Sequence, residues 1–230
     1  SLGVPVLTLS RWLLAAGGAA WRQPALAQAV TETLGYAALG ALAAAAAALP
    51  MAWLSVRSPG RASRVLEGCH SYLGALPGVV VALALVTVTV RIALPLYQTT
   101  ATVILAYVLM FLPRALVGLR AGIAQVPVEL ERAAAALGRS PAGSLLAVTL
   151  PLAAPGVAAA MALVAMGVST ELTATLLLAP NGTRTLATEF WALTGELDYA
   201  KAAPYAVLMI FLSLPMTALL HAQTRKSLGA

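Results

Sequence analysis

The stretch Glu129 to Pro151, ELERAAAALGRSPAGSLLAVTLP, places charged residues, glycines and two prolines between long apolar segments. Pro127, just before it, suits the first position of a helix because a helix leaves its first amide hydrogens unbonded. Glu129 and Glu131 then fall in the first turn, where the helix dipole favours negative charge. The pattern therefore predicts a short helix that begins at about residue 127.

A glycine and a capping pair divide this stretch in two. Gly138 is suited to turn the chain after the first helix, because glycine adopts the left-handed conformation without strain. Ser140 followed by Pro141 is a cap and first-position pair, which predicts the start of a second helix. We call residues 127–149 the elbow, and Leu150 and Pro151 then lead into an apolar segment.

The first elbow helix is predicted to have two faces. One apolar stripe follows the i, i+3, i+4, i+7 spacing and comprises Leu130, Ala133, Ala134 and Leu137. The residues expected to remain polar around it are Glu129, Glu131, Arg132 and Arg139. Two interpretations are open: an amphipathic segment that rests on lipid headgroups, or a lever through which a partner protein moves the adjoining segment.

The composition indicates an integral membrane protein. Hydrophobic residues make up 60% of the 230 residues and charged residues only 10%, against about 25% charged in ordinary soluble domains. Several apolar runs reach the roughly 20 residues that a helix needs to cross a bilayer. We expect an all-α bundle of five to six spans in one domain over residues 1–230.

Five spans stand out by apolar length and lack of charge: residues 33–56, 72–90, 99–118, 150–172 and 204–222. The first seventeen residues are predicted to be the end of an earlier span or an interfacial segment. The chain lacks an initiator Met, which suggests a piece of a longer polypeptide. Residues after 170 are interrupted enough to predict a short re-entrant or surface helix rather than another crossing.

Positive residues predict the orientation, because they are retained near span ends on the cytoplasmic side. Most of them gather around the elbow, the connection near residue 60 and the C-terminus: Arg57, Arg61, Arg64, Arg114, Arg120, Arg132, Arg139, Arg225 and Lys226. Arg11, Arg22, Arg91, Arg184 and Lys201 remain for the other side. The elbow is therefore expected in the cytoplasm, and Arg91 and Arg114 are expected near span ends, reaching the interfaces.

Several function classes are disfavoured. The scattered Lys and Arg form no basic face interleaved with aromatic residues, so a nucleic-acid partner is not expected. Glu67, Cys69 and His70 have no second cluster and are not expected to form a metal site. An intramembrane enzyme would require paired carboxylates or a metal-binding motif inside the spans. A stand-alone secondary transporter would favour an inverted repeat and would leave the elbow unexplained.

The elbow resembles a known signature, that of the membrane-spanning permease subunits of binding-protein-dependent ABC importers, which have the MetI-like fold. The signature runs Glu-Ala-Ala, three residues, Gly, nine residues, then Ile-x-Leu-Pro. In this chain Ala133, Ala134, Gly138, Leu150 and Pro151 occupy matching positions. The resemblance extends from about residue 25 to the C-terminus.

One position departs from the signature. The glutamate of the family falls on Arg132, a reversal of charge, and Glu131 stands directly before it. The contact that the family makes through that glutamate then falls to Glu131 or Glu129.

The resemblance implies a transport subunit rather than an enzyme. Such a subunit works with a second permease half, fused or separate, an extracytoplasmic binding protein and two ATPase subunits, one of which receives the elbow. It lies in the bacterial inner membrane. The chain lacks a G-x-x-x-x-G-K-[ST] loop, so ATP is expected to be used by the partner ATPase, and no cofactor is expected in this chain.

The substrate is expected from resemblance alone. The stretches YVLMFLPRALVGLRAGIAQVP and STELTATLLLAPNGTRTLA are most similar to iron(III) permeases, often two fused halves. Thiamine, polyamine and other small-solute permeases are the alternatives. The chain resembles a C-terminal half of such a fused permease.

Glu171 is the only ionisable residue between Ser144 and Asn181. A carboxylate there should face protein or water rather than lipid. It is either a residue of the substrate pathway, suited to a cationic substrate, or a structural residue hydrogen-bonded to Ser169 or Thr170. No catalytic residue is expected.

Overall fold

The computed structural model describes residues 3–58, 60, 65, 68, 74 and 76–228, with side chains up to residue 214. Every regular element in these ranges is a helix, which confirms the all-α class. In chain order the elements are α1 (Gly3–Ala16), a 3-10 turn (Gly18–Arg22), α2 (Pro24–Arg57), α4 (Gly78–Ile92), a second 3-10 turn (Leu94–Leu96), α5 (Thr100–Ala124), α6 (Val128–Ala136), α7 (Pro141–Ser144), a π-helix (Leu145–Thr149), α8 (Leu150–Leu152), α9 (Ala154–Ser169), α10 (Thr173–Leu178), α11 (Leu186–Gly195) and α12 (Tyr199–Leu228).

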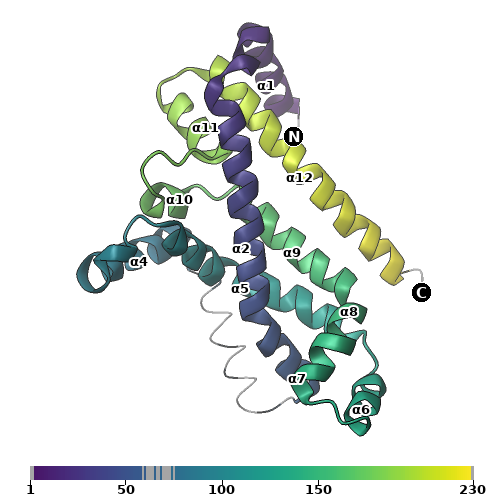
Figure 1. The fold of residues 1–230 in the computed structure, drawn as a ribbon. Coiled ribbons are helices and arrows are strands. Elements are labelled where there is room, and N and C mark those ends of the chain that lie inside the picture. Colours follow the sequence, from purple (N-terminus) through teal and green to yellow (C-terminus); the bar gives the residue numbers. More distant parts are fainter. Residues whose placement is uncertain are drawn as a thin grey trace.

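Helix α2 is the axis of the bundle and runs through most of its length (Figure 1). Its 34 residues span about 51 Å at 1.5 Å per residue. Because small side chains let helices approach closely, α5 and α9 pack against its alanine stripe. The buried alanines of this stripe are Ala37, Ala41, Ala44, Ala48 and Ala52.

Helices α5 and α9 are in backbone contact. A Cβ added to Gly156 would lie 2.5 Å from the Cα of Gly122, and one added to Gly118 would lie 2.7 Å from the Cβ of Ala160. Gly118 and Gly122 therefore let the two helices approach closely. These contacts also explain why α5 continues to Ala124 rather than ending near residue 118.

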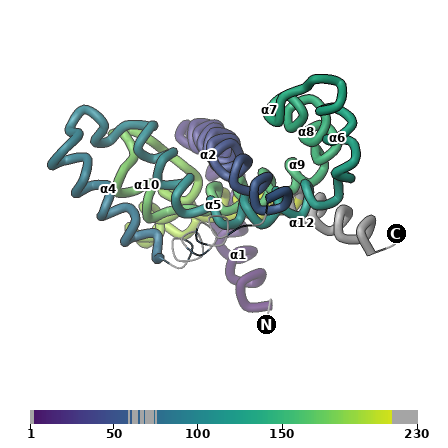
Figure 2. Tube along the Cα trace, turned by 90° about the horizontal axis from the view of Figure 1, so that it is seen from below, coloured from purple at the N-terminus to yellow at the C-terminus, as the bar shows by residue number. Residues whose placement is uncertain are grey.

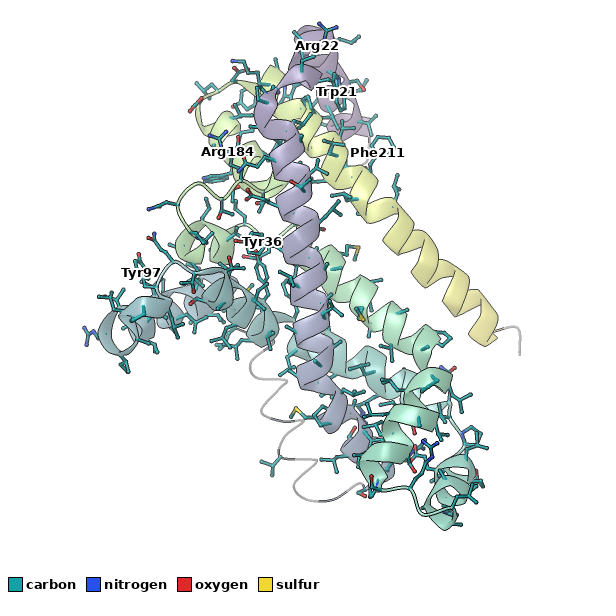
Figure 3. The ribbon with its side chains drawn as sticks, viewed as in Figure 1. Trp21, Arg22, Tyr36, Tyr97, Arg184 and Phe211 are labelled. Carbon is teal, nitrogen blue, oxygen red and sulfur yellow. The ribbon has the colours of Figure 1, made fainter. Side chains whose placement is uncertain are left out.

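A polar contact ties the core of the bundle to α10. The hydroxyl groups of Tyr107 on α5 and Thr175 on α10 lie 2.6 Å apart. The Tyr107 ring also packs edge-on against Tyr36, which lies partway along α2 on the side of α10 (Figure 3). Tyr107 is 1% exposed, so this hydrogen bond satisfies a polar group that burial would otherwise strand.

The described residues contain two helices, α2 and α5, that are long and apolar enough to cross a membrane. A third candidate is the bent pair Pro141–Leu152 and Ala154–Ser169, while α1, α4 and the Tyr199–Leu214 part of α12 are shorter apolar helices. The expectation of five to six spans therefore stays a prediction.

The expected start of the first span at residue 33 is wrong, because the helix begins at Pro24. The polar residues that suggested a boundary have partners. Glu32 accepts hydrogen bonds from Gln28 and from the backbone N–H of Arg184, and Thr33 accepts one from the backbone N–H of Leu186. A polar stretch satisfied in this way can stay helical within the bundle.

The expected continuous span over residues 150–172 is also wrong. The helices on either side of Ala153 meet at a bend of 79°. Pro155, in the first turn of α9, has no amide hydrogen, and its ring would collide with the carbonyl of Pro151 in a continuous helix. The helix must therefore restart after residue 153.

The segment after α9 forms two short helices, α10 and α11, which agrees with the short helix predicted there instead of a crossing. The side chain of Thr185 caps α11 by accepting a hydrogen bond from the backbone N–H of Thr188.

The two ends of the bundle carry different elements. Helices α6 to α8 gather at the end where α2 finishes, whereas α1 and α11 lie at the other end (Figure 1). Arg22 and Arg184 lie away from the elbow (Figure 3), on the side where the positive-residue pattern placed them. Seen along the bundle, α4 and α10 lie on one side of α2 and α6 to α8 on the other (Figure 2).

Some sequence predictions concern residues outside the described part of the chain. These are Arg61, Arg64, Glu67, Cys69, His70, the start of the span predicted over 72–90, and the side chains of Arg225 and Lys226.

Candidate functional site: the elbow

The first elbow helix, α6, begins at Val128, with Pro127 as its N-cap. The helix ends at the turn that Gly138 predicted. Gly138 has a φ of 85°, its N–H bonds to the carbonyl of Ala135, and the N–H of Arg139 bonds to the carbonyl of Ala134. These two bonds form a Schellman motif, which satisfies carbonyls left over at the end of a helix.

The second elbow helix is also capped as predicted. The Ser140 hydroxyl accepts a hydrogen bond of 3.1 Å from the N–H of Gly143, and Pro141 is the first residue of α7. After four residues α7 passes into the π-helix Leu145–Thr149. The two prolines and the glycine therefore produce a helix, a turn and a second helix.

Leu150 and Pro151 lie at the inner side of the bend between α8 and α9. Together with residues of α9, including Val157 and Met161, they line an open apolar groove of about 360 Å³. Their positions connect the elbow directly to the start of α9.

Among the described residues, an ion pair that is nearly closed to solvent fastens the elbow to the bundle. Arg57, the last residue of α2, places its Nε 2.9 Å from the Oε1 of Glu131 on α6, and both side chains are 11% exposed. The Nη2 of Arg57 also donates a 2.8 Å hydrogen bond to the carbonyl of Val126, just after α5. Thr149, in the π-helix, donates its hydroxyl to the same Glu131 oxygen. Four segments of the chain therefore meet at two charged side chains.

The position of Glu131 corrects the expected pattern of faces. It was expected to be polar surface, but it turns inward beside Ala134, which is 7% exposed. The expected apolar stripe is consequently split. Leu130 and Leu137 point away from the bundle, with exposures of 43% and 86%.

The outer face of the elbow is open. Its exposed residues from the sequence prediction are Glu129, Leu130, Arg132, Ala133, Leu137, Gly138 and Arg139. Glu129 is therefore the elbow acid left available to another molecule, because Glu131 is occupied by Arg57.

Arg57 is the site residue that sequence reasoning missed as part of the elbow. Its partner Glu131 is 74 positions away, and no local pattern connects them. The sequence signal is a basic residue at the end of an apolar run, which predicts membrane orientation but not this contact.

Glu171 lies at the opposite end of α9 from the elbow, between α9 and α10. Its Oε1 accepts a 2.9 Å hydrogen bond from the N–H of Ala174, and the same oxygen would lie 3.6 Å from a Cβ added to Gly78. Ser169 and Thr170, the expected structural partners, donate instead to backbone carbonyls. Within the described part of the chain, no three His, Cys, Asp or Glu side chains come together as metal ligands would.

The chain is similar to known transport proteins. The Fe(3+)-transport system permease protein FbpB 2 of Haemophilus influenzae is 38% identical over 215 residues, which is 93% of this chain but 42% of that relative. The chain thus spans less than half the length of this relative. A putative 2-aminoethylphosphonate transport system permease protein, PhnV of Salmonella typhimurium, is 29% identical over 90% of this chain and 76% of its own length.

Solved structures share the fold. A crystal structure of a bacterial alginate ABC transporter, in complex with its alginate-bound periplasmic protein, contains a chain that matches with a TM-score of 0.70 at 15% identity. The match covers 97% of this chain and 88% of that one.

The family comparison covers both the elbow and the bundle. The model of the family described as binding-protein-dependent transport system inner membrane component matches residues 40–227. These residues include α5, the whole elbow, α9 and most of α2 and α12. The chain therefore belongs to the family of binding-protein-dependent transport system inner membrane components.

Proposed function

We propose that this chain is a permease half of an ATP-driven ABC importer, with no catalytic site of its own. A second permease half, fused or separate, completes the pathway through the bacterial inner membrane. An extracytoplasmic binding protein delivers the substrate, and separate ATPase subunits on the cytoplasmic side bind and hydrolyse ATP. Membership of the family supports this assignment.

The observation that carries the proposal is the split of the elbow into a held face and an open face. The held face is anchored through Glu131 and Arg57. The open face presents two leucines and Glu129 to the surroundings, and a partner that grips it can displace α2, α5 and α9 together. The ATPase is the occupant we propose for this face, with Glu129 and Arg132 as its charged contacts.

The transported solute we propose is iron(III), because the similarity to the iron permease covers nearly the whole chain. The phosphonate permease supports a second candidate, a small anionic or zwitterionic solute. Glu171 is proposed to line the pathway, because its carboxylate lies where α4, α5 and α9 come together.

Replacing Gly138 with valine tests the elbow. A valine at a φ of 85° carries strain of about 1–3 kcal/mol, and it should distort the open face although no heavy atom lies within 4 Å of the new Cβ. We expect the Gly138→Val variant to recover much less ATPase than the wild type when the permease is purified by an affinity tag.

Gly182→Val is the matched control, because Gly182 also has a positive φ of 90° and open space around it but lies outside the elbow. It should recover ATPase as the wild type does. Equal recovery by both variants would contradict docking through the elbow.

The transport reaction itself distinguishes an importer from a stand-alone secondary transporter. In membrane vesicles loaded with ATP, the complex should take up radiolabelled iron(III) citrate only when ATP and the binding protein are present. Uptake driven by an ion gradient without ATP would contradict the proposal.

A further inference from the structure

Arg114 lies deep in an apolar helix. It stands about 21 Å from the start of α5 and about 15 Å from its end, at 1.5 Å per residue. The sequence predicted it near the end of a span, and this is wrong because α5 continues to Ala124. An arginine at such a depth is costly in lipid and is normally paired or in contact with water.

The Arg114 side chain does not reach toward the elbow end of the helix. Its guanidinium lies over the ring of Phe111, 5.3 Å from the ring centroid, and Phe111 is one turn closer to the start of α5. The arginine therefore does not extend to the nearer surface as a side chain near the end of a span would.

Gly167 on α9 makes room for this position. A Cβ added to Gly167 would lie 2.8 Å from Nη1 of Arg114 and 2.5 Å from the Phe111 ring. Gly167 stands about 20 Å along α9 from its first residue and near the C-terminal end of that helix, so the guanidinium lies far from the elbow end of α9. Any larger residue would displace the cation.

No carboxylate of the described residues lies within ion-pairing distance of Arg114; the pairs in these ranges are Arg57–Glu131, Arg184–Glu189 and Lys201–Asp198. Glu171 lies just beyond the end of α9, but its carboxylate accepts a hydrogen bond from the N–H of Ala174. The described part of the chain therefore stabilises the guanidinium only by the Phe111 ring, and Arg114 remains exposed.

An exposed arginine within a span must meet a polar environment. Its planar fork of donors matches carboxylate and phosphate-type oxygens, and it repels a bare cation. We propose that Arg114 lines the substrate pathway and binds an anionic group of the transported solute, so that a metal ion would pass with its anionic ligands. This inference rests on the proposed importer function.

The experiment uses the complete transporter with its ATPase and binding protein in vesicles, offered iron(III) citrate or 2-aminoethylphosphonate. With the solute that the wild type imports, Arg114→Gln should lower the initial uptake rate at least about tenfold, the loss expected for a charge-assisted hydrogen bond. Arg114→Lys should give an intermediate rate, because it keeps the charge without the bidentate geometry. Recovery of the purified complex should not change.

A thiol variant tests whether the charge itself matters. In a Cys69→Ser background, Arg114→Cys should regain uptake after reaction with trimethylammonium-ethyl methanethiosulfonate and not with the anionic sulfonatoethyl reagent. Leu105→Cys is the matched control. Leu105 is also exposed on α5 but lies half a turn away around the helix, at about 100° per residue, and neither reagent should change its uptake.

The remaining results of these uptake experiments would each contradict either the anion-binding role of Arg114 or the proposed solutes. Unchanged uptake by Arg114→Gln, or rescue by both reagents or by neither, contradicts anion binding. A complex that dissociates in Arg114→Gln contradicts it too and identifies an ion pair with the second permease half. A wild-type complex that imports neither solute contradicts the two proposed solutes and this inference with them, whereas the other outcomes contradict the inference alone.

Discussion

The two ends of α2 are attached to the rest of the molecule in different ways. At the elbow end, Arg57 and Glu131 form one ion pair that is nearly closed to solvent. At the far end, Glu32 and Thr33 each accept a hydrogen bond from the backbone near the start of α11. The ion pair of that region, Arg184 with Glu189, is long at 3.8 Å, and the arginine is 49% exposed.

At the elbow end the attachment of α2 depends mainly on one ion pair, whereas at the far end it is shared among several weaker contacts. Removing one partner of a buried ion pair leaves the other charge without compensation, which costs about 3–5 kcal/mol. A hydrogen bond between neutral groups contributes about 1 kcal/mol and one to a charged group such as Glu32 about 1.5–3 kcal/mol, and exposed ion pairs contribute less than about 1 kcal/mol. The far end also includes the exposed Lys201–Asp198 contact, in which hydrogen bonding from Lys201 lowers the pKa of the Asp198 carboxyl. The attachment of the elbow to α2 is therefore more sensitive to the loss of one side chain than the attachment at the far end.

The largest effect is expected from Arg57→Met. It leaves Glu131 buried without its cation and frees the carbonyl of Val126, so the free energy of unfolding should fall by about 3–5 kcal/mol. Thermal unfolding of the detergent-solubilised permease would measure the fall.

Two further variants accompany Arg57→Met. Arg132→Met, an exposed arginine of the same elbow, should leave the unfolding temperature nearly unchanged. Adding Glu131→Leu to Arg57→Met should restore part of the lost stability, because the uncompensated charge is then gone. A double variant as unstable as Arg57→Met would show that the ion pair is not the source of the effect.

A smaller effect is expected from Thr33→Val at the far end. The substitution keeps the shape but removes the acceptor for the buried N–H of Leu186, a loss of about 1–3 kcal/mol. Hydrogen exchange at the first turn of α11 should become faster. Thr31→Val is the control, since the exposed Thr31 hydroxyl bonds only within its own helix, and equal exchange in the two variants would contradict this attachment.

The smallest effect is expected from Arg184→Ala. It removes only the exposed pair with Glu189 and retains the backbone N–H that Glu32 accepts. Stability should change by less than about 1 kcal/mol, within the error of a thermal unfolding curve. A loss as large as that of Arg57→Met would remove the contrast between the two ends.

Features with a local cause were predictable from the sequence. The elbow turn depends on Gly138 and its second helix on Ser140 and Pro141, and each of these acts within a few residues. The 79° bend after α8 also has a local cause in Pro155, a signal that was present and that the apolar length of the segment obscured.

Features with a distant cause were not predictable. The polar start of α2 stays helical because Glu32 and Thr33 meet residues more than 150 positions away. Glu131 is buried because α2 brings Arg57 to it, and the depth of Arg114 depends on how far α5 continues beside α9. Such pairings require the folded arrangement of helices.

The contact between Gly122 and Gly156 limits how the helices of this bundle can move. Because the backbones of α5 and α9 touch at this point, no side chain can change its rotamer to absorb a displacement. A displacement of α9 is therefore transmitted directly to α5, and the two helices move as one rigid body. Even the smallest substitution, glycine to alanine at Gly122 or Gly156, would push the two helices apart, so mutation cannot change this contact gradually.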